Sequence, residues 1–137
     1  MRVFFDSSAF VKRYVREKGT EAVLTFCDEA AELCLSGIAL PEIVSAFCRL
    51  RREGVISPVQ YRHLKAHLLA DITDAAVCDL TPEVIHNAVI CLEKSALRAM
   101  DAIHVGSALT LKADLFVSAD ARQCAAAIAE GLRVEQV

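Results

Sequence analysis

Four acidic residues stand where folding could gather carboxylates for chemistry: Asp6, Glu42, Asp101 and Asp120. Asp6 and Asp120 each follow a short apolar run, Val3–Phe5 and Leu115–Val117, and such a run is typical of a strand buried on both faces. Open α/β sheets bind ligands beyond the carboxyl ends of their strands, so both acids are expected at one rim of a sheet. A helix cap is the alternative for each acid, since Asp120 and Gln123 also have the spacing of a capping box.

Asp101 is the acid that folding explains least. It lies in the helical pattern LRAMDAIHVGSAL, with Leu97 four residues before it and Val105 four residues after it. This spacing places it on an apolar stripe that faces other parts of the protein. A buried carboxylate is costly unless it is paired or bound to metal, so we expect a functional role. The alternatives are a salt bridge, for example to Arg98, and a boundary position that faces water.

Glu42 is a weaker candidate, because it follows Pro41 in the first turn of a predicted helix and acids there suit the helix dipole. It also borders the apolar face of that helix. His104 lies one turn after Asp101 and is expected to be a satisfied core histidine without a catalytic role. His63 and His67 have the spacing of a metal-binding pair, but no acidic motif accompanies them and a solvated face is expected.

These acids indicate a hard cation. The sequence has no glycine-rich phosphate loop, no GxSxG motif and no CxxC pair among its six cysteines. Carboxylate and hydroxyl oxygens suit Mg²⁺ or Mn²⁺ rather than zinc. Two such ions about 4 Å apart can clamp the attacking and leaving oxygens of a phosphoryl displacement.

The elements that must position these acids alternate along most of the chain, which predicts βαβ units and a parallel sheet. The predicted strands are Val3–Phe5, Leu33–Ser36, Ala75–Asp79 and Leu115–Val117, with Leu132–Val137 as a further edge strand. The predicted helices are Ala9–Lys18, Thr20–Ala31, one that opens at Pro41 and stops at Gly54, Pro58–Asp71, one that opens at Pro82, Leu97–Lys112 and Ala121–Glu130.

Length and composition predict one domain over residues 1–137. No apolar run approaches the roughly 18 residues of a membrane span, and Asp6 interrupts the first run before a signal-peptide core can form. Both observations point to the cytosol, where the cysteines are expected to be reduced and buried.

The formal net charge of −3 argues against a general nucleic-acid binder, so affinity for nucleic acid would need local patches, metal or a partner. The candidate patch is the basic face of the first predicted helix, formed by Lys12, Arg13 and Arg16, and simple solvation is its alternative.

Four segments resemble the PIN-domain family, and specifically the VapC-type toxin ribonucleases of prokaryotic toxin–antitoxin pairs. They are VFFDSSAFVKRY, PEIVSAFCRL, LRAMDAIHVGSAL and LFVSADARQCAAAIAEGL, and together they span essentially the whole chain. The resemblance implies a three-layer α/β/α sandwich with a central parallel sheet of four to five strands.

The same resemblance implies a function and a site. Asp6, Glu42, Asp101 and Asp120 would be the catalytic and metal-binding acids for Mg²⁺ or Mn²⁺, with Ser7 and Ser118 in support. The implied reaction is hydrolysis of RNA phosphodiester bonds, and the implied partners are a cognate antitoxin and a second copy of the chain.

Three other functions remain open from the sequence. A free-standing PIN nuclease without an antitoxin would carry the same motifs. An aspartyl-phosphate phosphatase would need a second acid two residues after Asp6, where Ser8 stands. A binding module would use the acids only as caps and surface charges, and would not respond to Mn²⁺.

Overall fold

The fold is built on one sheet of parallel strands. A computed structural model describes residues 1–137, the whole chain. The strand order is β3-β2-β1-β4-β5, and every neighbouring pair is parallel. The strands are β1 Arg2–Phe5, β2 Glu32–Ser36, β3 Ala76–Cys78, β4 Leu115–Ser118 and β5 Val134–Gln136. The three-layer α/β/α class with a parallel sheet is therefore confirmed.

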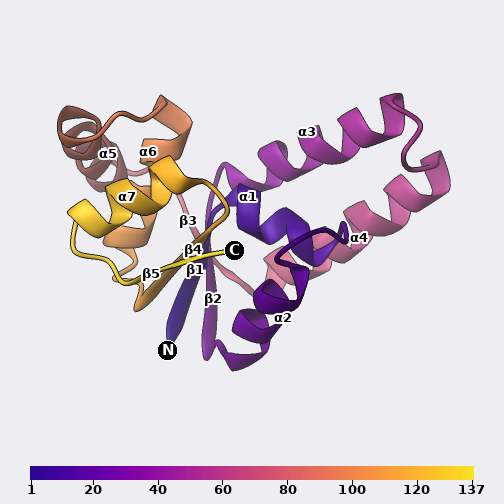
Figure 1. The fold of residues 1–137 in the computed structure, drawn as a ribbon, viewed down its shortest axis with the longest axis horizontal. Helices are drawn as coiled ribbons and strands as arrows, with labels where there is room; N and C mark the ends of the chain where they lie inside the picture. Colours follow the sequence, from indigo (N-terminus) through magenta and orange to yellow (C-terminus); the bar gives the residue numbers. More distant parts are fainter.

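Helices cover both faces of this sheet (Figure 1). The first layer contains α1 Ser7–Phe10, the 3₁₀ turn η1 Val11–Arg13, α2 Thr20–Glu29, α3 Ala39–Arg52 and α4 Pro58–Asp74. The second layer contains α5 Pro82–Lys94, α6 Ala99–Thr110 and α7 Ala121–Ala129. Helices α3 and α4 are antiparallel and extend beyond the sheet as an arm (Figure 1).

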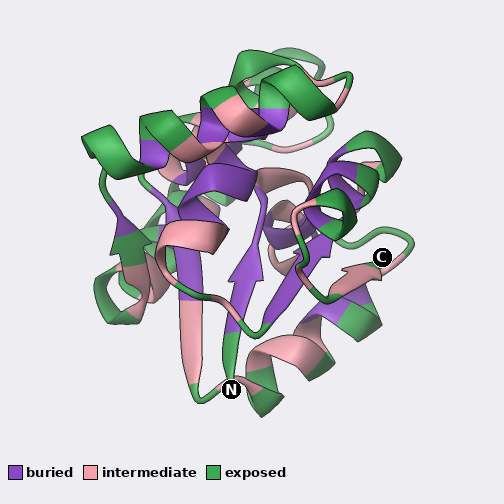
Figure 2. Cartoon of the chain, turned by 90° about the vertical axis from the view of Figure 1, so that its left-hand side faces the viewer, coloured by how far each residue is buried: buried purple, intermediate pink, exposed green.

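The side chains of β1 show why two helical layers form. Val3 and Phe5 point into the cluster of the first layer, whereas Phe4 between them points into the cluster of the second. Neighbouring side chains of a strand face opposite sides of the sheet, so an unbroken apolar run needs cover on both faces. All three residues are fully buried, and the central strands form the buried middle of the molecule (Figure 2).

Two helix starts agree closely with the sequence. Helix α4 begins at Pro58 with Ser57 as its cap, in a full capping box with Gln60, and α5 begins at Pro82 with Thr81 as its cap. Helix α3 begins two residues before Pro41, at Ala39. All six cysteines are free, and no helix is both long and apolar enough to cross a membrane.

The predicted helix Ala9–Lys18 is wrong. Helix α1 ends at Phe10, a short 3₁₀ turn follows, and the chain then bends around the side chain of Lys12. The Lys12 Nζ atom donates to the carbonyl of Lys18 at 2.6 Å and to that of Val137 at 3.2 Å. Periodicity alone could not reveal this tertiary contact.

The structure leaves only part of the candidate basic face open to solvent. Lys12 is buried, Arg13 pairs with Asp71 at 2.8 Å, and Arg16 pairs with Glu21. Lys12 and Arg13 are therefore engaged within the protein, whereas Arg16 stays on the surface with its exposed partner Glu21.

The Lys12→Ala variant is expected to lose about 1–3 kcal/mol of unfolding free energy, because two carbonyls lose a charged donor. Urea denaturation measures this loss. The matched control is Lys18→Ala, since the exposed Lys18 side chain makes no hydrogen bond or ion pair and its removal should cost less than about 0.5 kcal/mol. Equal losses in the two variants would contradict a structural role for the Lys12 ammonium group.

Candidate active site

Asp6 lies directly after β1 and is completely buried. Its carboxylate caps α1 by accepting from the Ala9 amide at 2.9 Å. It also accepts from Ser8 Oγ at 2.8 Å and from Ser118 Oγ at 2.6 Å. The helix-cap alternative is therefore correct for Asp6, and the hydroxyls hold the carboxylate in addition. Burial raises the pKa of Asp6 above its ordinary value, although the hydrogen bonds, chiefly that from Ser118, oppose the shift.

Ser118 connects two of the predicted acids. It is the last residue of β4, and its hydroxyl donates to Asp6 and accepts from the Asp120 amide at 3.0 Å. Since β1 and β4 are neighbouring parallel strands, Asp6 and Asp120 follow adjacent carboxyl ends of the sheet. The expected common rim is confirmed.

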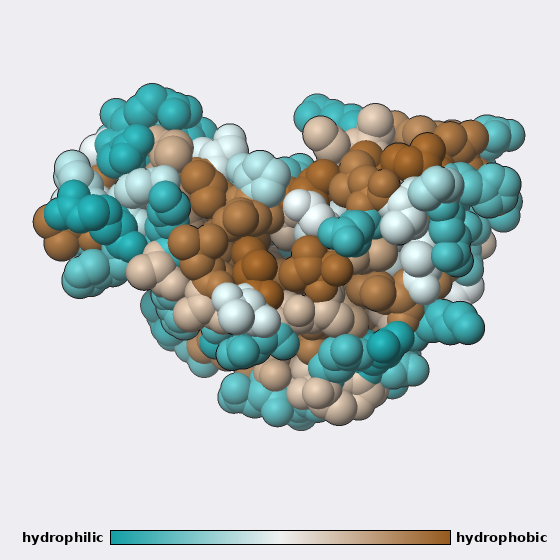
Figure 3. Space-filling model, turned by 180° about the vertical axis from the view of Figure 1, so that it is seen from behind, coloured by the Kyte–Doolittle hydropathy of each residue, from teal (hydrophilic) through white to brown (hydrophobic).

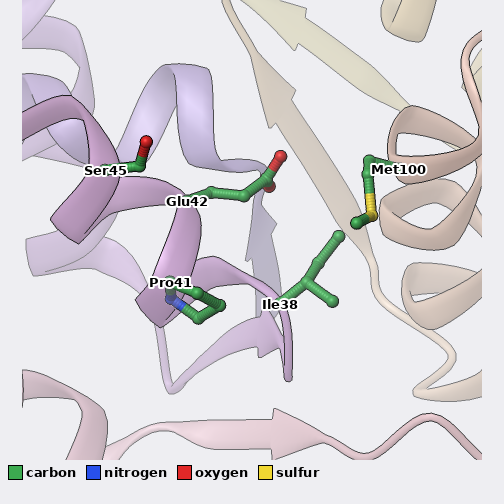
Figure 4. Close-up of a pocket in the computed structure, with 5 residues that line it drawn as sticks. All are labelled: Ile38, Pro41, Glu42, Ser45 and Met100. Carbon is green, nitrogen blue, oxygen red and sulfur yellow. The ribbon is translucent and has the colours of Figure 1, made fainter.

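Glu42 approaches this rim from the first turn of α3. Its Oε1 atom accepts from Ser7 Oγ at 2.7 Å and lies 2.5 Å from His104 Nε2. Burial alone would raise the pKa of Glu42, but the hydrogen bonds from His104 and Ser7 outweigh it and hold the pKa below its usual value. Glu42 is therefore ionised at neutral pH. It lines a pocket with Ser45 on its own helix and faces Met100 of α6 across the opening (Figure 4).

His104 is the site residue that the sequence did not identify. It lies in the buried middle of α6, is 1% exposed, and contacts Glu42 and, at 3.3 Å, Ser7 Oγ. Its Nδ1 atom is buried without a hydrogen-bond partner. The core position was expected, but the contact with Glu42 was not. The signal in the sequence that could have identified this residue is a histidine flanked by apolar residues on both sides, between Ala102 and Val105.

Asp101 is half-buried rather than enclosed as its apolar stripe predicted, because it lies in the first turn of α6 where the helix reaches solvent. It forms no ion pair with Arg98. Its Oδ1 atom instead accepts from the buried side chain of Gln123 at 3.1 Å. Burial and the nearby charge of Asp120 raise the pKa of Asp101.

Asp120 caps α7 by accepting from the amides of Arg122 at 2.8 Å and Gln123 at 3.4 Å. The capping interpretation is thus correct, but the Gln123 side chain turns to Asp101 instead of closing a capping box. Asp101 and Asp120 line one polar pocket together with Arg98, Ala121 and Arg122.

The predicted acids therefore occupy adjacent positions without forming one compact cluster. Asp101 and Asp120 share a pocket, Glu42 lines another, and Asp6 is buried and lines neither. No group of three or more His, Cys, Asp or Glu side chains has the geometry of a metal site. The chemistry of the possible metal ligands nevertheless fits a hard cation. The ligand atoms that line the pockets are carboxylate oxygens, and no protein cation pairs with Asp101 or Asp120.

Fold and site define a class of protein: a parallel α/β/α domain with carboxylates beyond the carboxyl ends of its central strands. The PIN domain family model matches residues 3–129, so the chain belongs to the PIN-domain family.

Solved structures share this fold. VapC20 of Mycobacterium tuberculosis, described as a toxin that cleaves the sarcin–ricin loop, is 15% identical with a TM-score of 0.68, and 95% of each chain is covered. A chain of FitAcB from Neisseria gonorrhoeae is 14% identical with a TM-score of 0.70, covering 96% of this chain and 95% of that one. A chain of DNA-bound VapBC from Salmonella typhimurium is 14% identical with a TM-score of 0.67, covering 99% of this chain and 98% of that one. No curated protein sequence matches this chain.

Proposed function

We propose that this chain is an Mg²⁺- or Mn²⁺-dependent endoribonuclease. The observation that carries the proposal is the pocket that Asp101 and Asp120 share, in which their like charges lie near each other and neither Arg98 nor Arg122 forms an ion pair with them. A like-charged pair at the ligand-binding rim of a parallel sheet suits a bound divalent cation. Membership of the PIN-domain family supports the same reaction.

In this proposal Asp101 and Asp120 hold the ion, together with Glu42 and Asp6. The ion would neutralise phosphate charge and lower the pKa of a bound water. The protein fixes the ligands: His104 and Ser7 hold Glu42 ionised and oriented, and Gln123 holds Asp101. Because Ser8 and Ser118 already bind both oxygens of Asp6, that carboxylate would reach an ion only after a hydroxyl turns away.

We further propose that the protein is the toxin of a type II toxin–antitoxin pair, acting as one domain in the cytosol. Solved structures of the same fold include a toxin–antitoxin complex from Klebsiella pneumoniae, which supports an antitoxin partner here. A free-standing RNA-processing nuclease is the alternative. A small neighbouring gene that encodes a DNA-binding protein would distinguish the toxin from that alternative.

A homodimer is part of this proposal. The edge strand β3 and helix α5 expose apolar side chains, and apolar atoms gather broadly on the rear face of the molecule (Figure 3). The exposed apolar residues of this region are Val77, Leu80, Ile85, Val89 and Leu92. Apolar surface of this kind marks protein contacts, and a second copy of the chain is the partner that we propose.

The experiment that tests the nuclease is RNA cleavage by the purified protein with Mg²⁺, with Mn²⁺ and with EDTA. We expect cleavage with either metal and none with EDTA. The Asp101→Asn variant should be slower by about a hundredfold or more, since even residues that only orient metal ligands cost 10–100-fold. The matched control is Asp28→Asn, an exposed acid on α2, which should retain full activity. Cleavage that persists after thorough chelation would refute the metal mechanism.

A further inference from the structure

The free cations of this acidic protein are not where the sequence suggested. Segment 49–70, the outer part of the α3–α4 arm, contains five cations and a single acid, Glu53. Four of these cations are exposed and make no ion pair or side-chain hydrogen bond: Arg49, Arg52, Arg62 and Lys65. Arg49 and Arg52 are the two that lie on α3, the helix that carries Glu42. Arg49 and Arg52 are available to an external ligand, unlike the buried Lys12 and the paired Arg13.

Arg49 and Arg52 lie on the same face of α3 as the site. Counted from Glu42, Ser45 is three residues on, Arg49 seven and Arg52 ten, which is the spacing of one helical stripe. Ser45 lines the pocket of Glu42, and both side chains point to the same side of the helix (Figure 4). Seven residues of α-helix span about 10 Å, so the stripe leads from the pocket outward along the arm.

Two further arginines lie across the acidic centre. Arg98 and Arg122 line the pocket of Asp101 and Asp120, yet neither forms an ion pair with these carboxylates. Both side chains are exposed. Both pockets reach the start of α6, where Met100 lines one and the next residue, Asp101, lines the other.

We propose that single-stranded RNA crosses the acidic centre with its phosphates bound by Arg98 and Arg122 on one side and by Arg49 and Arg52 on the other. This binding path rests on the proposed nuclease function and names the residues that bind its substrate. A polyanion is repelled by the carboxylates, so its affinity must come from cations beside them. The exposed stripe Ser45, Arg49 and Arg52 is wholly polar, which fits a phosphate backbone better than an acidic protein helix with apolar anchors.

The test uses three double variants that remove the same charge: Arg49→Gln with Arg52→Gln, Arg98→Gln with Arg122→Gln, and the control Lys112→Gln with Arg133→Gln. The control cations are exposed, make no side-chain hydrogen bond or ion pair, and precede β4 and β5 at the end of the sheet opposite the site. Binding of a fluorescent, unstructured RNA is measured in EDTA, where no cleavage occurs, at several salt concentrations. Thermal melting verifies that each variant folds.

Each site-side pair is expected to weaken RNA binding about tenfold at low salt. The slope of log affinity against log salt should become shallower by about 0.7 for each lost phosphate contact. The control pair should change neither quantity. Equal losses in all three variants would overturn the proposal, because only net charge would then matter, and so would unchanged binding in both site-side pairs. A loss of binding to an acidic peptide without any loss of RNA binding would also overturn it.

The cleavage assay separates this proposal from the proposed function. If the wild type cleaves RNA while both site-side pairs bind it normally, the binding path is wrong and the nuclease stands. If the wild type never cleaves RNA but both site-side pairs lose binding, the binding path stands and the nuclease is wrong.

Discussion

The Gly106→Val variant is expected to lose about 3 kcal/mol or more of unfolding free energy. Gly106 lies in α6 where α5 crosses it, and a Cβ atom there would be 2.8 Å from the Val84 carbonyl oxygen and 3.0 Å from the Ala88 nitrogen. Both are backbone atoms, so α5 would have to move as a whole. Overpacking a tight core costs about 1–3 kcal/mol. Valine adds two methyl groups beyond the Cβ atom, so its cost should lie at or above the upper end of this range.

The Gly106→Ala variant tests the same close approach of α5 with a smaller side chain. In an ordinary helix Gly→Ala stabilises by about 1 kcal/mol, but Gly106→Ala should destabilise because its single methyl group already meets α5. The control Ala99→Val adds a branched side chain at an exposed position of the same helix and should cost less than about 1 kcal/mol. Urea denaturation measures all three variants. A stabilised Gly106→Ala protein would show that α5 yields without cost.

The close approach of α5 to α6 bears on the site, since α6 carries Asp101 and His104. The sequence indicated this helix correctly but gave no reason to place α5 against Gly106. A glycine inside a helical pattern shows only that something lies close, not which segment it is.

The strands and the rim acids were predictable because their signal is local. Unbroken apolar runs identified β1 and β4. The first run ends directly at Asp6, and Asp120 follows the second run three residues after Val117. The proline-containing helix starts at Pro58 and Pro82 were equally local, since a cap and its helix lie within a few residues.

The contacts that hold the acids were not predictable, because their partners are distant in the chain. His104 and Glu42 are separated by 62 positions, and Gln123 and Asp101 by 22. Periodicity reports whether a side chain faces inward but not what it meets there. The same limit explains the error at Lys12, whose second partner, Val137, is 125 positions away.

The Asp101→Asn variant is expected to lose the stabilisation that Mn²⁺ gives to the wild type. In the proposed site Mn²⁺ binds only the folded protein, so it should add about 2.7 kcal/mol when free metal exceeds its dissociation constant a hundredfold. The variant lacks one proposed ligand, and its melting temperature should respond little to metal. The measurement is thermal melting of both proteins in EDTA and in millimolar Mn²⁺, with Asp28→Asn as a control that should respond like the wild type.

The same melts in EDTA test the electrostatics of Asp101. Burial and Asp120 raise the pKa of Asp101 above 3.8, so the folded state holds its proton more tightly than the unfolded state does. Below pH 3.8 the two proteins should be equally stable on this account; as pH rises through the raised pKa, the wild type should lose stability relative to Asp101→Asn. The asparagine keeps a carbonyl oxygen for the hydrogen bond from Gln123, so no buried donor is left unpaired. If the variant instead melts well below the wild type in EDTA at neutral pH, Asp101 is a structural partner and the metal assignment fails for this residue.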